Sequence, residues 1–268
     1  MLTHPEVFIR LAKCFEHLAS LQIHHTSMTN QPGKAALAYC ILLLASACQP
    51  STDQSKNNAT SALATDLKPE IPAAVFPHPQ TPDEAIAQLK EGNARFINDQ
   101  SAHPNRDDNR KIIQAQKQTP FASIMGCSDS RVPAEIVFDQ GLGDLFIVRT
   151  AGQAPAKASF GSLEFSVAVL GVKVIVVMGH EKCGAVAGAI GTAKLPGHIE
   201  DLVNIIRPGV KEYIGKPDKL EEAGKANVLA EVENLKKLDP ILSRYVKEGK
   251  IKIIPAYYHL ETGRVEFL

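Results

Sequence analysis

Two stretches of the sequence each contain an apolar run that ends in glycine and is followed by side chains that bind metals. The first is Phe121-Ala-Ser-Ile-Met-Gly126, followed by Cys127-Ser-Asp-Ser-Arg131. The second is Val174-Ile-Val-Val-Met-Gly179, followed by His180-Glu-Lys-Cys-Gly184. Short apolar runs rich in β-branched residues are typical of buried strands. Two such strands ending side by side would bring both sets of polar side chains to one point.

Three of these side chains form a candidate zinc site. Cys127 and Cys183 offer two thiolates and His180 offers an imidazole, a set of ligands that suits Zn²⁺. Three protein ligands leave a fourth position for chemistry, as in catalytic zinc sites. In an oxidising compartment the same two cysteines could instead form a structural disulfide.

Around these stretches the sequence alternates between helical and extended patterns. Apolar runs predict strands at residues 121–126, 144–149, 173–178 and 251–257, with a short returning strand at 264–268. Helical periodicity and capping signals predict helices at residues 81–98, 110–118, 159–170, 185–190, 198–214 and 226–246. This alternation indicates an α/β fold with a parallel sheet, whose ligand sites lie at the carboxyl ends of the strands.

Composition and charge are those of an ordinary soluble domain with appendages. Of the 268 residues, 44% are hydrophobic and 22% are charged, which is typical of globular proteins. The formal net charge is zero, so electrostatics do not favour nucleic acid or an anionic membrane surface as a partner. Three of the five cysteines lie within the first 48 residues. A disulfide framework is therefore not expected in the folded part.

The N-terminal region is predicted to export and anchor the protein. Residues 35–47 form an apolar run after Lys34 that is shorter than the about 20 residues needed to span a bilayer, and it fits a secretory signal peptide. The stretch Leu44-Ala-Ser-Ala-Cys48 resembles a bacterial lipobox in which Cys48 is lipidated. The alternative is an ordinary signal peptide cleaved after Ala47. We therefore expect a periplasmic protein, lipid-anchored to a bacterial membrane through Cys48.

The remaining boundaries follow from start and composition signals. Met28 gives the signal peptide a compact beginning, so residues 28–48 are assigned to it and residues 1–27 to an upstream extension. A competing interpretation makes residues 1–27 an amphipathic helix. Residues 49–80 are rich in small and polar residues and are predicted to be a disordered tether. The folded domain is expected at residues 81–268, where Thr81-Pro-Asp-Glu84 is a strong helix start.

Taken together, the motifs resemble those of the β-class carbonic anhydrases. Cys127-x-Asp129-x-Arg131 precedes His180-x-x-Cys183, as in that family. The segments 141–152 and 92–96 also resemble family segments, so the resemblance covers about residues 81–268. It implies the β-carbonic anhydrase fold, a zinc cofactor and interconversion of carbon dioxide and bicarbonate. It also implies a homodimer or homotetramer.

The resemblance further implies roles for individual residues. Zinc lowers the pKa of bound water to about 7, and the resulting hydroxide attacks carbon dioxide. Paired with Arg131, Asp129 would accept a hydrogen bond from that hydroxide; unpaired, it could bind zinc as a fourth ligand. Both states are open from sequence. Gln118 resembles a glutamine that hydrogen-bonds substrate in one branch of the family. Gly184 is a second candidate for substrate binding, because close backbone approach near a metal calls for glycine.

Two other functions use the same residues. The site could hydrolyse carbonyl sulfide or carbon disulfide, which activity against those substrates would distinguish. The chain could also be a non-catalytic zinc-binding lipoprotein, although zinc storage does not need the Asp129–Arg131 pair. His259, like His78, His103 and His198, is interpreted as a solvated residue and is given no catalytic role. The chain has no tryptophan, which argues against the family branch that binds regulatory bicarbonate through one.

Overall fold

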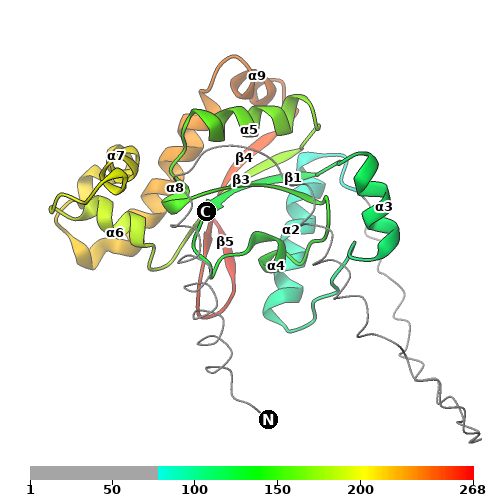
Figure 1. Ribbon diagram of the computed structural model, residues 1–268, viewed down its shortest axis with the longest axis horizontal. Helices are drawn as coiled ribbons and strands as arrows, with labels where there is room; N and C mark the ends of the chain where they lie inside the picture. Colours follow the sequence, from blue (N-terminus) through cyan, green and yellow to red (C-terminus); the bar gives the residue numbers. More distant parts are fainter. Residues whose placement is uncertain (1–77) are drawn as a thin grey trace, which may run out of the picture. The chain divides into compact units, whose positions relative to one another are not determined.

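The protein is built on a five-stranded sheet with helices on both faces (Figure 1). A computed structural model describes residues 78–268. The sheet order is β2-β1-β3-β4-β5, and the strands are β1 (Ala122–Cys127), β2 (Leu145–Thr150), β3 (Val174–His180), β4 (Lys252–Tyr258) and β5 (Val265–Phe267). The first four are mutually parallel, and β5 pairs antiparallel with β4. The predicted parallel sheet and its returning last strand are confirmed.

The helices mostly begin and end near the predicted residues. They are α2 (Pro82–Ile97), α3 (Asp108–Gln116), α4 (Ala134–Val137), α5 (Lys157–Ala168), α6 (Gly184–Ile190), α7 (His198–Val210), α8 (Leu220–Lys236) and α9 (Leu242–Lys247). Short 3₁₀ turns occupy Ala151–Gln153, Lys211–Tyr213 and Pro217–Lys219. The expected start of α2 is confirmed, because Thr81 and Glu84 cap each other's backbone N–H groups.

Two details of the predicted helices are wrong. The single helix expected at residues 226–246 is instead α8 followed by α9. Pro240 lies between them; it has no N–H to donate and disfavours helical geometry at the preceding Asp239. The short helix α4 was not predicted, since four residues carry too little periodicity to be recognised.

The central strands β1 and β3 are buried on both faces, which explains why they read as continuous apolar runs. Successive residues of a strand point to opposite faces. Ile124 belongs to the core beneath α2 and α4, and its neighbour Met125 belongs to the core beneath α5, α8 and α9 (Figure 1). A third apolar cluster packs α6 and α7 and includes Cys127 and Cys183. The candidate ligands therefore lie where this third cluster meets the strand ends.

The side chain of Asn93 connects α2 to α4 and to β5 through three hydrogen bonds. Its amide donates to the carbonyls of Val137 and Gly263 at 3.0 and 2.9 Å, and its oxygen accepts from the N–H of Val265 at 2.9 Å. The side chain is buried. One buried residue of the segment 92–96 thus joins α2 to α4 and to β5, which gives that segment a structural role.

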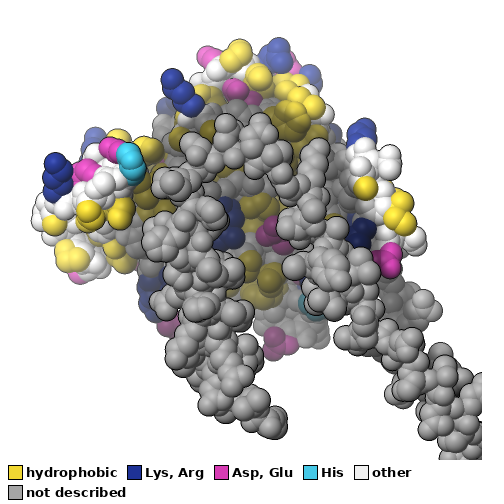
Figure 2. All heavy atoms as spheres, viewed as in Figure 1, with side chains coloured by type: hydrophobic (Ala, Val, Ile, Leu, Met, Phe, Trp, Pro, Cys, Tyr) yellow, Lys and Arg dark blue, Asp and Glu magenta, His cyan; other side chains and the backbone are white. Residues whose placement is uncertain are grey.

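The surface carries charges of both signs. Figure 2 shows acidic, basic and histidine side chains close together over α6 and α7, in agreement with the formal net charge of zero. Within residues 78–268, no helix has the length and apolar content that crossing a membrane requires. The predictions for the extension, the signal peptide, Cys48 and nearly all of the tether lie outside the described residues.

A carboxyl group of α8 is buried, and no cation among residues 78–268 forms an ion pair with it. Glu231 is 3% exposed, and burial raises its pKa to about 7. Within residues 78–268, the one hydrogen bond to its side chain comes from the Asn234 amide at 3.5 Å. The unfolded chain releases this proton near pH 4.3, so the folded state loses stability as the pH rises from there to about 7.

We expect Glu231→Gln to stabilise the protein by up to about 3 kcal/mol at pH 8 and by only about 1 kcal/mol at pH 5. Glutamine has the shape of the neutral acid and does not ionise. Urea unfolding at the two pH values measures the difference. Glu233→Gln is the control on the same helix, because that carboxylate is exposed and pairs with Lys236. An equal effect of Glu231→Gln at both pH values would contradict the raised pKa.

Candidate metal centre and active site

The pairing of β1 with β3 brings the candidate ligands together. The strands are parallel, with Gly126 opposite Met178, so Cys127 and His180 lie at the same edge of the sheet. Cys183 follows three residues later and precedes α6. The ligand atoms of Cys127, His180 and Cys183 all lie within 4.8 Å of one another, and all three residues are buried. The predicted convergence is confirmed.

The two cysteines are free thiols, so the alternative disulfide is not present. The sulfur of Cys127 accepts a hydrogen bond from Cys183, which lowers the pKa of Cys127 to about 4 against the opposing effect of burial. The same hydrogen bond, together with burial, raises the pKa of Cys183. Binding a metal through both sulfurs requires both to be thiolates, so any proton on the pair is released on binding.

Gly152 supports the sulfur of Cys127 from the backbone. Its N–H donates to Cys127 Sγ at 3.2 Å, and its φ of 63° lies in the left-handed region that glycine adopts without strain. A Cβ atom at this position would lie 2.7 Å from Ile206 Cδ1 and 2.9 Å from Ala185 Cβ. From sequence, Gly152 was part of a resembling segment without a role; the positive φ and the contact with sulfur supply one.

His180 presents one ring nitrogen to the cysteines. Its Nδ1 lies 2.8 Å from the carbonyl oxygen of Glu181. A carbonyl oxygen can only accept, so Nδ1 carries the hydrogen and donates it. The neutral ring then has a bare Nε2, which is buried and has no hydrogen-bond partner among residues 78–268. An orphaned nitrogen beside two thiols fits a zinc ion, which takes nitrogen and sulfur ligands in such groups.

Asp129 lies beside this group and is held by Arg131. The guanidinium donates from Nε to Oδ1 at 2.9 Å and from Nη2 to Oδ2 at 2.7 Å, and the Arg131 N–H also donates to Oδ1 at 2.9 Å. These contacts hold the pKa of Asp129 well below its usual range, with burial opposing them. Asp129 Oδ2 is 3.9 Å from His180 Nε2. Of the two states left open by the sequence, the structure has the paired one.

Arg149 is a functional residue that sequence reasoning missed. Its Nε donates to the carbonyl of Cys127 at 2.8 Å and its Nη2 to that of Asp129 at 2.6 Å. One side chain thus fixes both ends of the turn that carries the first ligand. Arg149 pairs with Gly126 across the parallel strands β2 and β1, so an explicit strand register would have placed it beside this turn.

The two candidate substrate residues occupy different places. Gly184 is exposed as the first residue of α6, directly after Cys183. Apart from its chain neighbours and the backbone of its own helix, no atom of residues 78–268 lies within 4 Å of where its Cβ would be. Gln118 is exposed in the connection before β1. Since β1 separates it from Cys127, the two ends are about 20 Å apart at about 3.3 Å per strand residue. The structure therefore does not bring Gln118 to the ligands of its own chain.

The sequence matches the carbonic anhydrase family over residues 122–265. It is 40% identical over 193 residues to a carbonic anhydrase of Mycolicibacterium smegmatis, covering 69% of this chain and 92% of that protein. It is also 40% identical over 190 residues to carbonic anhydrase 2 of Mycobacterium tuberculosis, covering 68% and 91%.

Among solved structures, the chain resembles a Coccomyxa β-carbonic anhydrase in complex with acetazolamide, with a TM-score of 0.55 at 26% identity over 68% of this chain and 86% of that one. A tetrameric β-carbonic anhydrase of Sordaria macrospora shares the fold with a TM-score of 0.54 at 23% identity, covering 60% and 87%.

The fold and the Cys-His-Cys group define a zinc enzyme with its metal at the carboxyl ends of a parallel sheet. The chain belongs to the carbonic anhydrase family and is a carbonic anhydrase of the β class. The expectations of fold, family and zinc cofactor are confirmed.

We expect Cys127→Ser, His180→Ala and Cys183→Ser each to lose zinc, because two remaining ligands do not complete a zinc site. After dialysis against a chelator of moderate affinity, elemental analysis should give about one zinc per chain for the wild type and under about a tenth for each variant. Ser130→Ala, an exposed change in the first ligand turn, is the control that should retain its zinc. Tight binding of one zinc by any of the three ligand variants would refute the assignment.

Proposed function

We propose that this chain hydrates carbon dioxide reversibly, giving bicarbonate and a proton, at a zinc ion held by Cys127, His180 and Cys183. The observation that carries the proposal is the Asp129–Arg131 pair beside these ligands, with Asp129 Oδ2 only 3.9 Å from His180 Nε2. Bound zinc supplies a Lewis acid that makes a water molecule nucleophilic near neutral pH.

Asp129 orients the attacking water in this proposal. Its carboxylate is ionised, because Arg131 lowers its pKa, and an ionised carboxylate can only accept hydrogen bonds. It could therefore accept a hydrogen bond from the water and so orient an oxygen lone pair toward the carbon of carbon dioxide. Arg131 makes a two-point contact with both carboxylate oxygens, a geometry that holds the carboxylate in one orientation. The same contact restrains Asp129 from filling the fourth ligand position.

Gly184 and Gln118 are proposed to contact substrate from different chains. The open space above Gly184 lies directly after the ligand Cys183, so substrate can approach the backbone there. Gln118 is at the opposite end of β1 from Cys127, so its contact with substrate requires the site of a second subunit. This is consistent with a homodimer or homotetramer, and the Sordaria macrospora relative is described as tetrameric.

We expect Asp129→Asn to keep its zinc and to lose about 10²-fold or more in kcat, because the amide can donate where an acceptor is needed. Arg131→Ala should also lower kcat, since the substitution frees Asp129 to bind the metal. Stopped-flow hydration with a pH indicator measures the rates, with zinc content determined on the same samples. The control is Asp108→Asn, which breaks an exposed ion pair on α3. A zinc-loaded Asp129→Asn enzyme with wild-type kcat would disprove the role.

For localisation, we propose export and lipid anchoring at Cys48, supported by the apolar run at residues 35–47 and the lipobox-like residues before that cysteine. Cys48→Ala should move the protein from the membrane fraction to the soluble fraction when the full chain is expressed in a bacterium. Cys40→Ala, within the apolar run, is the matched control and should stay in the membrane fraction. Membrane association of Cys48→Ala at the wild-type level would rule out anchoring through this residue.

A further inference from the structure

We propose that Glu181 is a positioning residue for the zinc ligands and that its position is set by His259. Glu181 directly follows the ligand His180, at a place where the family motif specifies no residue type. His259 lies just beyond β4 and has no role assigned from sequence. The proposal rests on the zinc site described above and concerns how its second ligand turn is held.

The backbone of Glu181 holds the imidazole of His180. The Glu181 carbonyl accepts the hydrogen bond from His180 Nδ1 at 2.8 Å, so this peptide group decides which ring nitrogen is bare. The Glu181 N–H donates to the Tyr258 carbonyl at 3.1 Å, which extends the pairing of β3 with β4. In zinc proteins, the group that binds the second nitrogen of a ligand histidine fixes the orientation of the ring.

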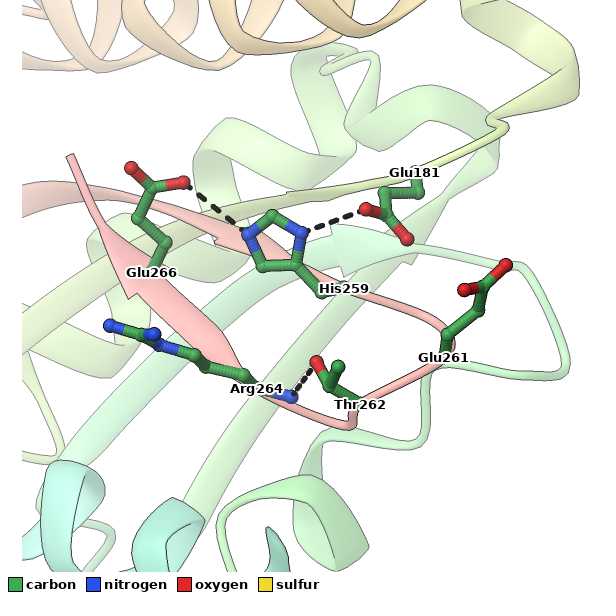
Figure 3. Close-up of a pocket in the computed structure, with 6 residues that line it drawn as sticks. All are labelled: Glu181, His259, Glu261, Thr262, Arg264 and Glu266. Carbon is green, nitrogen blue, oxygen red and sulfur yellow. Dashed lines mark hydrogen bonds and ion pairs between the residues drawn. The ribbon is translucent and has the colours of Figure 1, made fainter.

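The side chain of Glu181 is fastened at both oxygens. Oε1 lies 2.8 Å from His259 Nδ1 (Figure 3). Oε2 accepts from the N–H of Leu260 at 2.9 Å. The other ring nitrogen of His259 faces Glu266 Oε2 at 3.3 Å. The carboxylate therefore joins the second ligand turn to the connection between β4 and β5, and His259 is itself held between two carboxylates rather than being freely solvated.

The turn between His180 and Cys183 needs such support. Lys182 has a φ of 53°, a left-handed conformation that is uncommon for residues other than glycine. Such a conformation persists when the surrounding structure over-determines it. The contacts of Glu181 anchor the residue immediately before Lys182. Among residues 78–268, the one ion pair of the Lys182 side chain is an exposed contact with Glu261 at 3.3 Å. Glu181 is thus the main side-chain link between this turn and the sheet.

The test compares zinc affinity in four variants by competition with a chromophoric chelator. Glu181→Ala removes both side-chain contacts, and we expect zinc affinity to fall about 10- to 100-fold. His259→Ala leaves the Leu260 contact, so its loss should be smaller. Glu181→Gln keeps one acceptor oxygen and should recover part of the affinity. Glu261→Gln is the matched control on the neighbouring exposed pair and should bind zinc like the wild type.

The absorption spectrum of the Co²⁺-substituted protein is the second readout. A displaced imidazole changes the ligand field, so the visible bands of Glu181→Ala should shift while those of Glu261→Gln stay unchanged. Zinc affinity within twofold of the wild type and an unchanged Co²⁺ spectrum in Glu181→Ala would overturn the proposal. Because both readouts measure metal binding, they test Glu181 separately from carbon dioxide hydration, whose absence from zinc-loaded wild type would defeat only the proposed function.

Discussion

The parallel pairing of β1 with β3 is the constraint on which the rest of the site depends. Side chains alternate between the two faces of a strand, so a slip of one residue would turn every side chain to the opposite face. The observed register buries both strands completely and ends them at the same edge of the sheet. Cys127 and His180 follow from that register, and Cys183 is brought back to them by the turn that begins α6.

Hydrogen bonds between side chains and backbone carbonyls help to hold the two ligand turns. Arg149 grips the carbonyls of Cys127 and Asp129, while the Glu181 carbonyl holds the ring of His180. The Asp129–Arg131 pair belongs to the first ligand turn and comes within 3.9 Å of His180 on the second. The sheet places the ligands approximately, and these contacts supply the finer orientation that chemistry at a metal requires.

The strands and the ligand set were predictable because burial on both faces leaves continuous apolar runs and because Cys and His have few competing roles at strand ends. The roles of Arg149, Gly152 and Glu181 were not, since each depends on a partner from a different strand or connection. The break at Pro240 was visible in the sequence, but the apolar periodicity runs on past it. Whether Asp129 pairs with Arg131 or turns toward the metal depends on its side-chain rotamer, which a sequence pattern does not specify.

The central claim is that zinc is held by three side chains while Arg131 keeps Asp129 out of the fourth position. A crystal structure of the zinc-loaded protein at neutral pH, with anomalous scattering recorded at the zinc edge, tests it directly. The account predicts one peak per chain, about 2.3 Å from both sulfurs and about 2.0–2.1 Å from His180 Nε2, with Asp129 still paired to Arg131. A peak coordinated by Asp129, or a peak away from these three ligands, would contradict it.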